Sequence, residues 1–153
     1  MTFSAVAFMK EALMEAKKAT LIDEVPVGAV VVHEGCIISR GHNLTRSTCD
    51  PTAHGEVVAL RRAAEVLKTP ILENCDVYVT LEPCAMCGGA LSLARIRHVY
   101  FGAFDPKGGA LDHGPRLYEQ PTCLHRPQVW GGIEENQCQK ALKEFFIKKR
   151  TCL

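Results

Sequence analysis

The chain is organised around residues 76–87, which read Asp76-Val77-Tyr78-Val79-Thr80-Leu81-Glu82-Pro83-Cys84-Ala85-Met86-Cys87. The first half of this stretch is mostly apolar and rich in β-branched residues, which is typical of a buried strand. Pro83 favours the first position of a helix, where its missing backbone donor costs nothing. We therefore expect a strand that leads directly into a helix, with Cys84 and Cys87 on one face of the first helical turn.

The two cysteines are candidate metal ligands, because the positive end of a helix dipole favours the thiolate form that binds metals. Two sulfur atoms leave a tetrahedral Zn²⁺ ion half coordinated, and the sequence has no second Cys-x-x-Cys motif. His54 is the best candidate for a third ligand. Three protein ligands with an open fourth position describe a catalytic zinc site, where a water molecule can ionise near neutral pH.

Glu56 lies two residues after His54 and is the candidate proton carrier. A carboxylate beside the water can take its proton and pass it to a leaving group. Glu56 could instead be a metal ligand, but His54, Cys84 and Cys87 are softer donors and suit zinc better. The pair of motifs His-x-Glu and Pro-Cys-x-x-Cys resembles the signature of zinc-dependent nucleobase deaminases. A redox pair, or half of a structural zinc site, remains the alternative interpretation of the cysteines.

Composition indicates an ordinary globular chain, with 47% hydrophobic and 23% charged residues among 153. This length fits a single domain spanning residues 1–153. The net charge of +1 gives no overall electrostatic signal for nucleic-acid binding. The start of the chain lacks the pattern of a signal peptide, and no apolar run reaches the roughly 18 residues that would cross a membrane. We therefore expect a reducing, cytoplasmic location. No function is predicted for the cysteines without metal-ligand spacing, which are Cys36, Cys49, Cys75, Cys123, Cys138 and Cys152.

The first half of the chain predicts a helix, a hairpin and a second helix. Apolar residues at helical spacing from Ser4 to Lys18 predict an amphipathic helix, whose Phe8 and Met14 we expect in the core. Residues 25–32 and 36–40 predict two strands joined by a turn at 33–35. A polar loop at 41–52 should deliver Asn43 toward His54, which begins a helix over 56–67.

The second half alternates strands and helices in the same way. The helix that contains the two cysteines continues to residue 93, and residues 96–101 and 129–133 predict two further strands. Residues 102–126 are irregular, and long loops of this kind often carry binding residues. Residues 134–150 predict a last helix with acidic residues first and basic residues last. This order predicts a three-layer α/β/α fold with a central mixed sheet of about five strands, and a metal site where two helices begin beside strand ends.

With these motifs in place, the chain resembles the bacterial tRNA-specific adenosine deaminases of the cytidine-deaminase-like superfamily, nearly from end to end. The segments that carry the resemblance are 24–30, 50–54, 80–84, 101–107 and the Phe145-Phe146 pair before the basic tail. The resemblance implies the cytidine-deaminase-like fold and a homodimer with one Zn²⁺ per subunit. It also implies conversion of adenosine to inosine at the wobble position of the tRNA anticodon. A zinc-activated water would attack C6, while Glu56 protonates N1 and then the leaving ammonia.

The same resemblance implies roles for further residues. Asn43 would hydrogen-bond the flipped nucleoside, and the surrounding pocket would include Val27, Gly55 and Pro83. The RNA around the base would meet Asp105, Lys107, Phe145, Phe146 and Arg150, since RNA loops are read by aromatic and basic side chains. Plainer alternatives stay open. Asn43 could form an Asx turn, the two phenylalanines could lie in the core, and the basic tail could be a solvated helix end.

Two other functions compete with this interpretation. A guanine deaminase, or another free-base or nucleoside deaminase, would share the fold and the metal motifs. A non-enzymatic zinc-binding or RNA-binding module would also use the cysteines, but it would not require Glu56. The flanking segments Asp105-Pro106-Lys107 and Phe145 to Arg150 favour the tRNA-specific enzymes over the other deaminases.

Overall fold

The computed structural model describes residues 2–151. In chain order its helices and strands are α1 (Thr2–Leu21), β1 (Gly28–His33), β2 (Cys36–His42), α2 (Gly55–Leu67), β3 (Cys75–Leu81), α3 (Ala85–Leu93), β4 (His98–Ala103), the short 3-10 helix η1 (Leu117–Glu119), β5 (Gln128–Trp130) and α4 (Glu135–Thr151). The predicted alternation of strands and helices is therefore confirmed, with shifts of a few residues at the boundaries.

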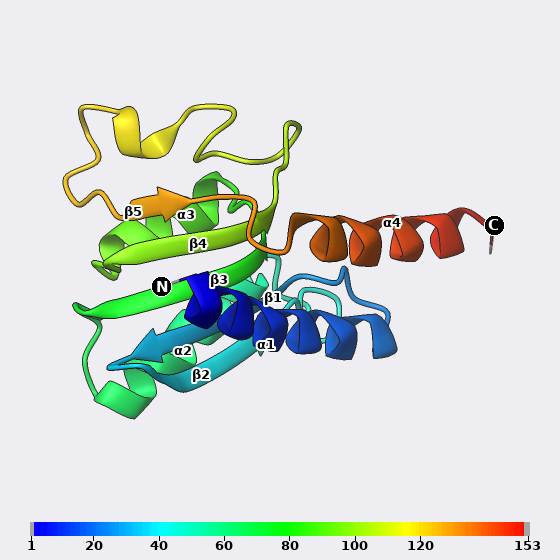
Figure 1. Cartoon of the computed structure of the whole chain (residues 1–153), viewed down its shortest axis with the longest axis horizontal. Helices are drawn as coiled ribbons and strands as arrows, with labels where there is room; N and C mark the ends of the chain where they lie inside the picture. Colours follow the sequence, from blue (N-terminus) through cyan, green and yellow to red (C-terminus); the bar gives the residue numbers. More distant parts are fainter. Residues whose placement is uncertain (1, 152–153) are drawn as a thin grey trace.

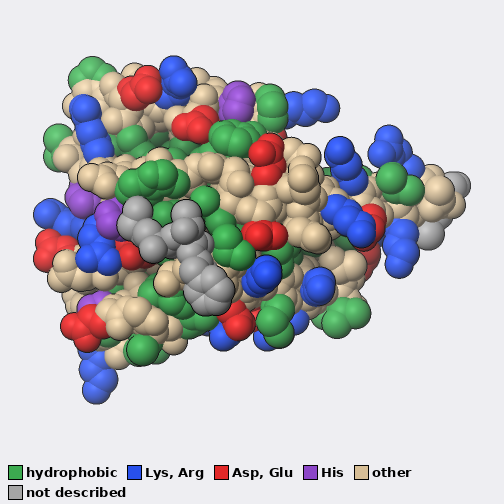
Figure 2. Space-filling view, in the orientation of Figure 1, with side chains coloured by type: hydrophobic (Ala, Val, Ile, Leu, Met, Phe, Trp, Pro, Cys, Tyr) green, Lys and Arg blue, Asp and Glu red, His purple; other side chains and the backbone are tan. Residues whose placement is uncertain are grey.

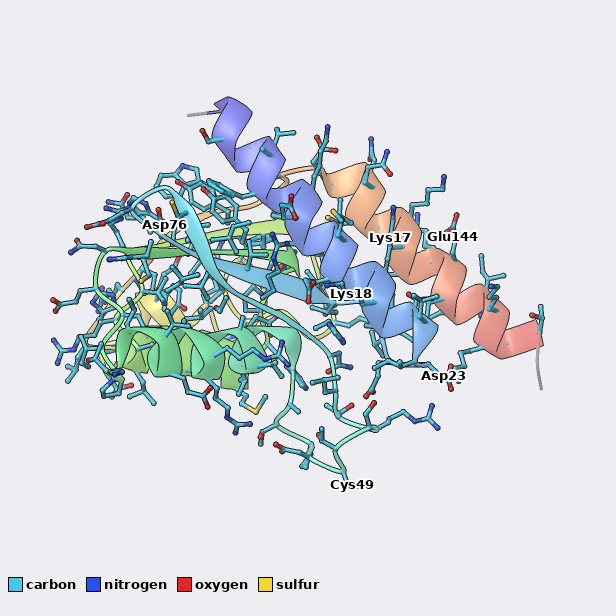
Figure 3. The ribbon with its side chains drawn as sticks, turned by 90° about the horizontal axis from the view of Figure 1, so that it is seen from below. Lys17, Lys18, Asp23, Cys49, Asp76 and Glu144 are labelled. Carbon is cyan, nitrogen blue, oxygen red and sulfur yellow. The ribbon has the colours of Figure 1, made fainter. Side chains whose placement is uncertain are left out.

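The strands form one five-stranded mixed sheet in the order β2-β1-β3-β4-β5. Strand β1 is antiparallel to both of its neighbours, whereas β3, β4 and β5 run parallel to one another. Helices α1 and α4 cover one face of the sheet, and α2 and α3 cover the other (Figures 1 and 3). This arrangement confirms the predicted three-layer α/β/α fold.

The central strands are buried on both faces, which explains why they read as almost continuous apolar runs. Successive side chains point to opposite faces. Val77 of β3 therefore packs toward α2 and α3, while its neighbour Tyr78 packs toward α1. Strand β4 repeats the pattern with Val99 and Tyr100. Each face of the sheet thus has its own hydrophobic core.

The ends of several elements meet at one edge of the sheet. Because β1 is antiparallel to β3, the start of β1 lies beside the end of β3, with Ala29 opposite Val79. Parallel pairing brings the end of β4 to the same edge, where Ala103 is the partner of Leu81. Helices α2 and α3 also begin there. This edge therefore collects the residues on which the predicted function depends.

Two details of the sequence prediction are corrected. Met14 is 54% exposed and does not lie in the core, because it lies on the side of α1 that faces away from the sheet. Phe8 is half-buried against the ring of Tyr78, at 5.1 Å between centroids, as predicted. The first strand begins at Gly28 and not at residue 25, since Pro26 has no N–H and Val27 donates to the carbonyl of Val25 over 2.8 Å.

Within residues 2–151, no helix is long and apolar enough to cross a membrane. The described cysteines are all free thiols. Cys152 lies outside the described residues.

Candidate active site

The three candidate ligands come from the starts of two helices. His54 immediately precedes α2, with φ −70° and ψ 155°, and Cys84 immediately precedes α3, with φ −72° and ψ 177°. Cys87 lies in the first turn of α3. Pro83 was predicted at the first helical position, which is wrong: the extended backbone of Cys84 delays the helix to Ala85, so Pro83 lies one residue before the cap.

The ligand atoms are close enough to share one metal ion. The Nδ1 atom of His54 lies 3.7 Å from the Sγ atom of Cys84 and 3.5 Å from that of Cys87. All three atoms lie within 4.8 Å of one another. Zn–N bonds of about 2.0 Å and Zn–S bonds of about 2.3 Å at a tetrahedral angle place two such ligands roughly 3.6 Å apart. The donor set and its spacing therefore fit zinc.

The electrostatics of the triad favour a thiolate. A hydrogen bond from Cys87, followed by one from His54, lowers the pKa of Cys84 to about 4. The pKa of Cys87 is raised, chiefly because its thiol donates to Cys84 and because it is buried. Cys84 is therefore a thiolate at neutral pH before a metal binds. Metal binding would then deprotonate Cys87.

Glu56 occupies the first turn of α2, beside His54 and 3% exposed. Burial raises the pKa of this carboxyl group, and the hydrogen bond from Cys87 opposes that shift only in part. A buried carboxyl group that holds a proton more readily than usual is suited to proton transfer. It lies beside the triad, because the thiol of Cys87 shares a hydrogen bond with it.

His54, Glu56 and Cys84, but not the fully buried Cys87, open onto a pocket of about 230 Å³. Three of the predicted substrate-binding residues, Val27, Asn43 and Gly55, line it together with His54, Glu56, Cys84, Asp105 and others. Pro83 does not line the pocket, and instead its carbonyl accepts a hydrogen bond from Ala110. Lys107 is exposed just beyond the pocket-lining Asp105. The structure therefore brings the predicted chemistry and most of the predicted base contacts to one place.

The remaining predicted RNA contacts lie on α4, away from the pocket lining. Phe145 is 8% exposed and packs against α1, whereas Phe146 is 46% exposed. Arg150 is exposed in the last turn, where Lys148 and Lys149 add two further charges. Figure 2 shows Lys and Arg side chains gathered over this end of the molecule.

The sequence prediction missed several residues around the pocket. Val25, Leu81, Glu82 and Gly108 also line it, and Glu82 is 2% exposed. A second buried carboxylate, Glu24, is 0% exposed and holds the loop after Asn43 through Arg46 and Ser47. Glu24 and Glu82 each adjoin an apolar, strand-like run of sequence. An acidic residue next to such a run could have indicated a buried carboxylate.

Comparison with known proteins identifies the family of the chain. Residues 4–103 match the family model described as the cytidine and deoxycytidylate deaminase zinc-binding region. The tRNA-specific adenosine deaminase of Agrobacterium fabrum is 50% identical over 143 residues, which cover 94% of each chain.

Two solved structures extend the comparison. One comes from a study of A-to-I editing by tRNA:A34 deaminases at the wobble position of transfer RNA, with a TM-score of 0.88 and 50% identity over 89% of this chain and 99% of that one. A guanine deaminase from Bacillus subtilis has a TM-score of 0.62 and 40% identity over 64% of this chain and 63% of its own. The chain therefore belongs to the cytidine and deoxycytidylate deaminase family and, within it, to the tRNA-specific adenosine deaminases.

Proposed function

We propose that this protein is a zinc-dependent hydrolase that converts adenosine to inosine at the wobble, or first anticodon, position of tRNA. The observation that carries the proposal is the clustering of His54, Cys84 and Cys87 beside Glu56, at a pocket that His54, Cys84 and Glu56 line. The near full-length similarity to tRNA-specific adenosine deaminases supports the choice of substrate. We further propose that residues 1–153 form a single domain and that the enzyme works in the cytoplasm.

His54, Cys84 and Cys87 would hold one Zn²⁺ per subunit. When bound, zinc supplies a water molecule that ionises near neutral pH and can attack C6 of adenine. His54 and Cys84 line the pocket, so water and substrate would reach the bound metal from the pocket. The residues of the chain then determine where the base lies and where the protons go.

Glu56 would move the protons in both halves of the reaction. Its carboxylate accepts a proton from the attacking water and delivers it to N1 of the purine. A second proton from the same water then reaches the amino group, which leaves as ammonia. Adenosine and water thus give inosine and ammonia, with Glu56 returned to its starting state.

Asn43 and the pocket walls would hold the base. The backbone N–H of Asn43 donates to the carbonyl of Val27 over 3.1 Å, and the Asn43 side chain lines the pocket with Val27 and Gly55. A side-chain amide offers both a donor and an acceptor to a purine. The nucleotides on either side of the base would then contact Asp105 and Lys107. Phe146 and Arg150, at the exposed end of α4, would contact nucleotides farther along the anticodon loop.

A homodimer would bury the outer face of α3. Met86 is 37% exposed and Leu93 is 81% exposed, and they lie on α3 on either side of Gly89. Exposed apolar side chains near a small residue allow a second helix to approach closely. Replacing Leu93 with Glu should shift the mass measured by light scattering from dimer to monomer. A wild-type protein that is monomeric at micromolar concentration would exclude the dimer.

The substrate is tested with purified protein and two candidate substrates. An anticodon stem-loop with adenosine at the wobble position should yield inosine, detected by mass spectrometry of the digested RNA. Guanine is the second substrate because the guanine deaminase shares part of the fold at 40% identity. Efficient conversion of guanine to xanthine, with no inosine in the RNA, would overturn the proposal. Loss of turnover in Glu56→Gln would exclude a purely RNA-binding module.

A further inference from the structure

Glu82 is a buried carboxylate that no step of the proposed reaction uses. It lies between the end of β3 and the Cys84 turn, and its side chain is 0% exposed. Oε1 accepts hydrogen bonds from the N–H of Asp105 at 3.1 Å and from Nδ1 of His113 at 2.8 Å. Oε2 accepts from the N–H groups of Leu111, Asp112 and His113 at 3.3, 3.0 and 3.1 Å. One side chain thus binds both ends of the loop 105–113.

These contacts satisfy a charge that would otherwise be costly to bury. Each hydrogen-bond partner of the two carboxylate oxygens is an N–H donor, so Glu82 acts as an acceptor throughout. Four backbone N–H groups of the loop, in turn, find their acceptor in this single residue.

The loop that Glu82 binds is one wall of the pocket. Asp105 and Gly108 line the pocket from this loop. The N–H of Gly109 donates to the carbonyl of Asp105, and that of Ala110 donates to the carbonyl of Pro83, both over 2.9 Å. A Cβ atom on Gly109 would overlap the Glu82 carboxylate, so the loop backbone lies directly against it. The position of the wall depends on this close approach.

We propose that Glu82 is a positioning residue, which fixes the loop 105–113 as a wall of the pocket and thereby sets the affinity for the RNA around the reacting base. It acts through Asp105 and its neighbours and does not touch the reacting atoms. This inference rests on the proposed function for its kinetic consequence, but the tether between Glu82 and the loop can be tested without any substrate.

Glu82→Gln is the first test variant. Glutamine keeps the shape but offers one acceptor oxygen, so it loses the hydrogen bonds of either Oε1 or Oε2. The KM for the anticodon stem-loop should rise about tenfold, with kcat within about threefold, because the loop 105–113 contains neither the proton carrier nor a metal ligand. Zinc content should stay unchanged.

Glu15→Gln is the matched control. Glu15 is also a buried carboxylate, 2% exposed, with hydrogen bonds to Lys18 and His42, but it lies on α1 and does not contact the loop 105–113. This variant should leave both KM and kcat as in the wild type. An equal rise of KM in the control would assign the effect to general loss of stability and overturn the proposal.

Amide hydrogen exchange separates the tether from the function. In Glu82→Gln the amide of Asp105 or those of residues 111–113 should exchange faster, while those of the β3 strand remain protected. Unchanged exchange in the loop overturns the proposal, and so does loss of zinc without a change in the loop. If wild-type protein fails to act on the stem-loop, the proposed function falls, but the exchange result still decides whether Glu82 holds the loop.

Gly109→Ala disrupts the same contact by changing the loop and not Glu82. It provides the test if Glu82→Gln does not fold. The added methyl group pushes the loop off the carboxylate while Glu82 itself stays intact. The same rise in KM and the same faster exchange are expected. A variant with wild-type KM and wild-type exchange would overturn the proposal.

Discussion

The Nδ1 atom of His54 lies 3.5 Å from the Sγ atom of Cys87, although 33 positions separate the two residues in the sequence. The contact joins the starts of two helices that follow different strands. A metal ion bound there would link α2 to α3 directly. Loss of one ligand should therefore affect both metal binding and the stability of this edge of the sheet.

Cys87→Ala should release the metal. Zinc affinity is expected to fall by more than the ~10–100-fold that removal of an outer hydrogen-bonding partner costs, because a direct bond is lost. Metal content after dialysis, measured by mass spectrometry, tests this. Cys75→Ala is the control, since Cys75 is a buried free thiol outside the triad. Full zinc content in Cys87→Ala would refute the ligand set.

Glu56→Gln should keep the metal and lose the reaction. Glutamine has nearly the same volume but cannot accept and release a proton at this step, so kcat should fall by about 10²–10⁴-fold. The measurement pairs zinc content with single-turnover inosine formation. If zinc is lost together with activity, Glu56 is a ligand and its assigned role is wrong.

Asn43→Ala should weaken substrate binding in the pocket. Loss of hydrogen bonds to the base should lower kcat/KM by about 10- to 100-fold while zinc content is retained. Asn136→Ala, at an exposed position near the start of α4, is the control and should behave as the wild type. A normal kcat/KM in Asn43→Ala would favour the plain Asx-turn interpretation of this residue.

Phe145 and Phe146 are adjacent, yet they should respond differently to truncation. Phe145→Ala should lower the free energy of unfolding by about 2–3 kcal/mol, somewhat less than in a deep core, because Phe145 packs in an open groove against α1. Phe146→Ala should leave stability within ~0.5 kcal/mol and weaken RNA binding. Urea denaturation and fluorescence anisotropy with labelled stem-loop measure the two effects. The reverse outcome would assign Phe146 to the core.

Glu24 makes a contribution to stability that depends on pH. Burial raises its pKa, but hydrogen bonds led by that from the backbone of Ser47 lower it below the usual value. A carboxylate with a lowered folded-state pKa stabilises the fold above its unfolded pKa of about 4.3, and this contribution disappears as the pH falls through the folded-state pKa. The wild type should therefore be more stable than Glu24→Gln at neutral pH, and the difference should shrink in acid. Urea titrations across that range measure it, and a constant difference would contradict the assignment.

The sequence was sufficient for the order of elements and for the reactive groups. The run from Val77 to Cys87 contains its own strand, turn and helix signals, so its structure follows from local rules. His54 and Glu56 were found because metal and proton chemistry demand particular side chains at short spacing. The predictions failed where the environment of a residue depends on segments far away in the sequence. Met14 is an example, because its exposure depends on how α1 packs against the sheet.

The buried carboxylates were missed for the same reason. Glu82 binds groups 23 to 31 residues away, and Glu24 binds groups 21 to 23 residues away. The residues next to Glu82 and Glu24 in the sequence do not indicate which distant loop packs against each carboxylate. The periodicity of a strand predicts which side chains are buried, but it does not predict the backbone N–H groups that make an acidic residue acceptable inside.

The outer end of α4 projects beyond the sheet in Figure 1 and extends past the end of α1. From Phe146 to Thr151 the side chains are exposed, except for the half-buried Lys149, whose Nζ lies 2.6 Å from Asp23. A helix end with so few contacts unfolds locally at a small cost in free energy. Ordering it when RNA binds costs conformational entropy, which makes binding weaker. Thr151→Ala, which raises helix propensity without adding any contact, would then tighten RNA binding purely by lowering that entropic cost.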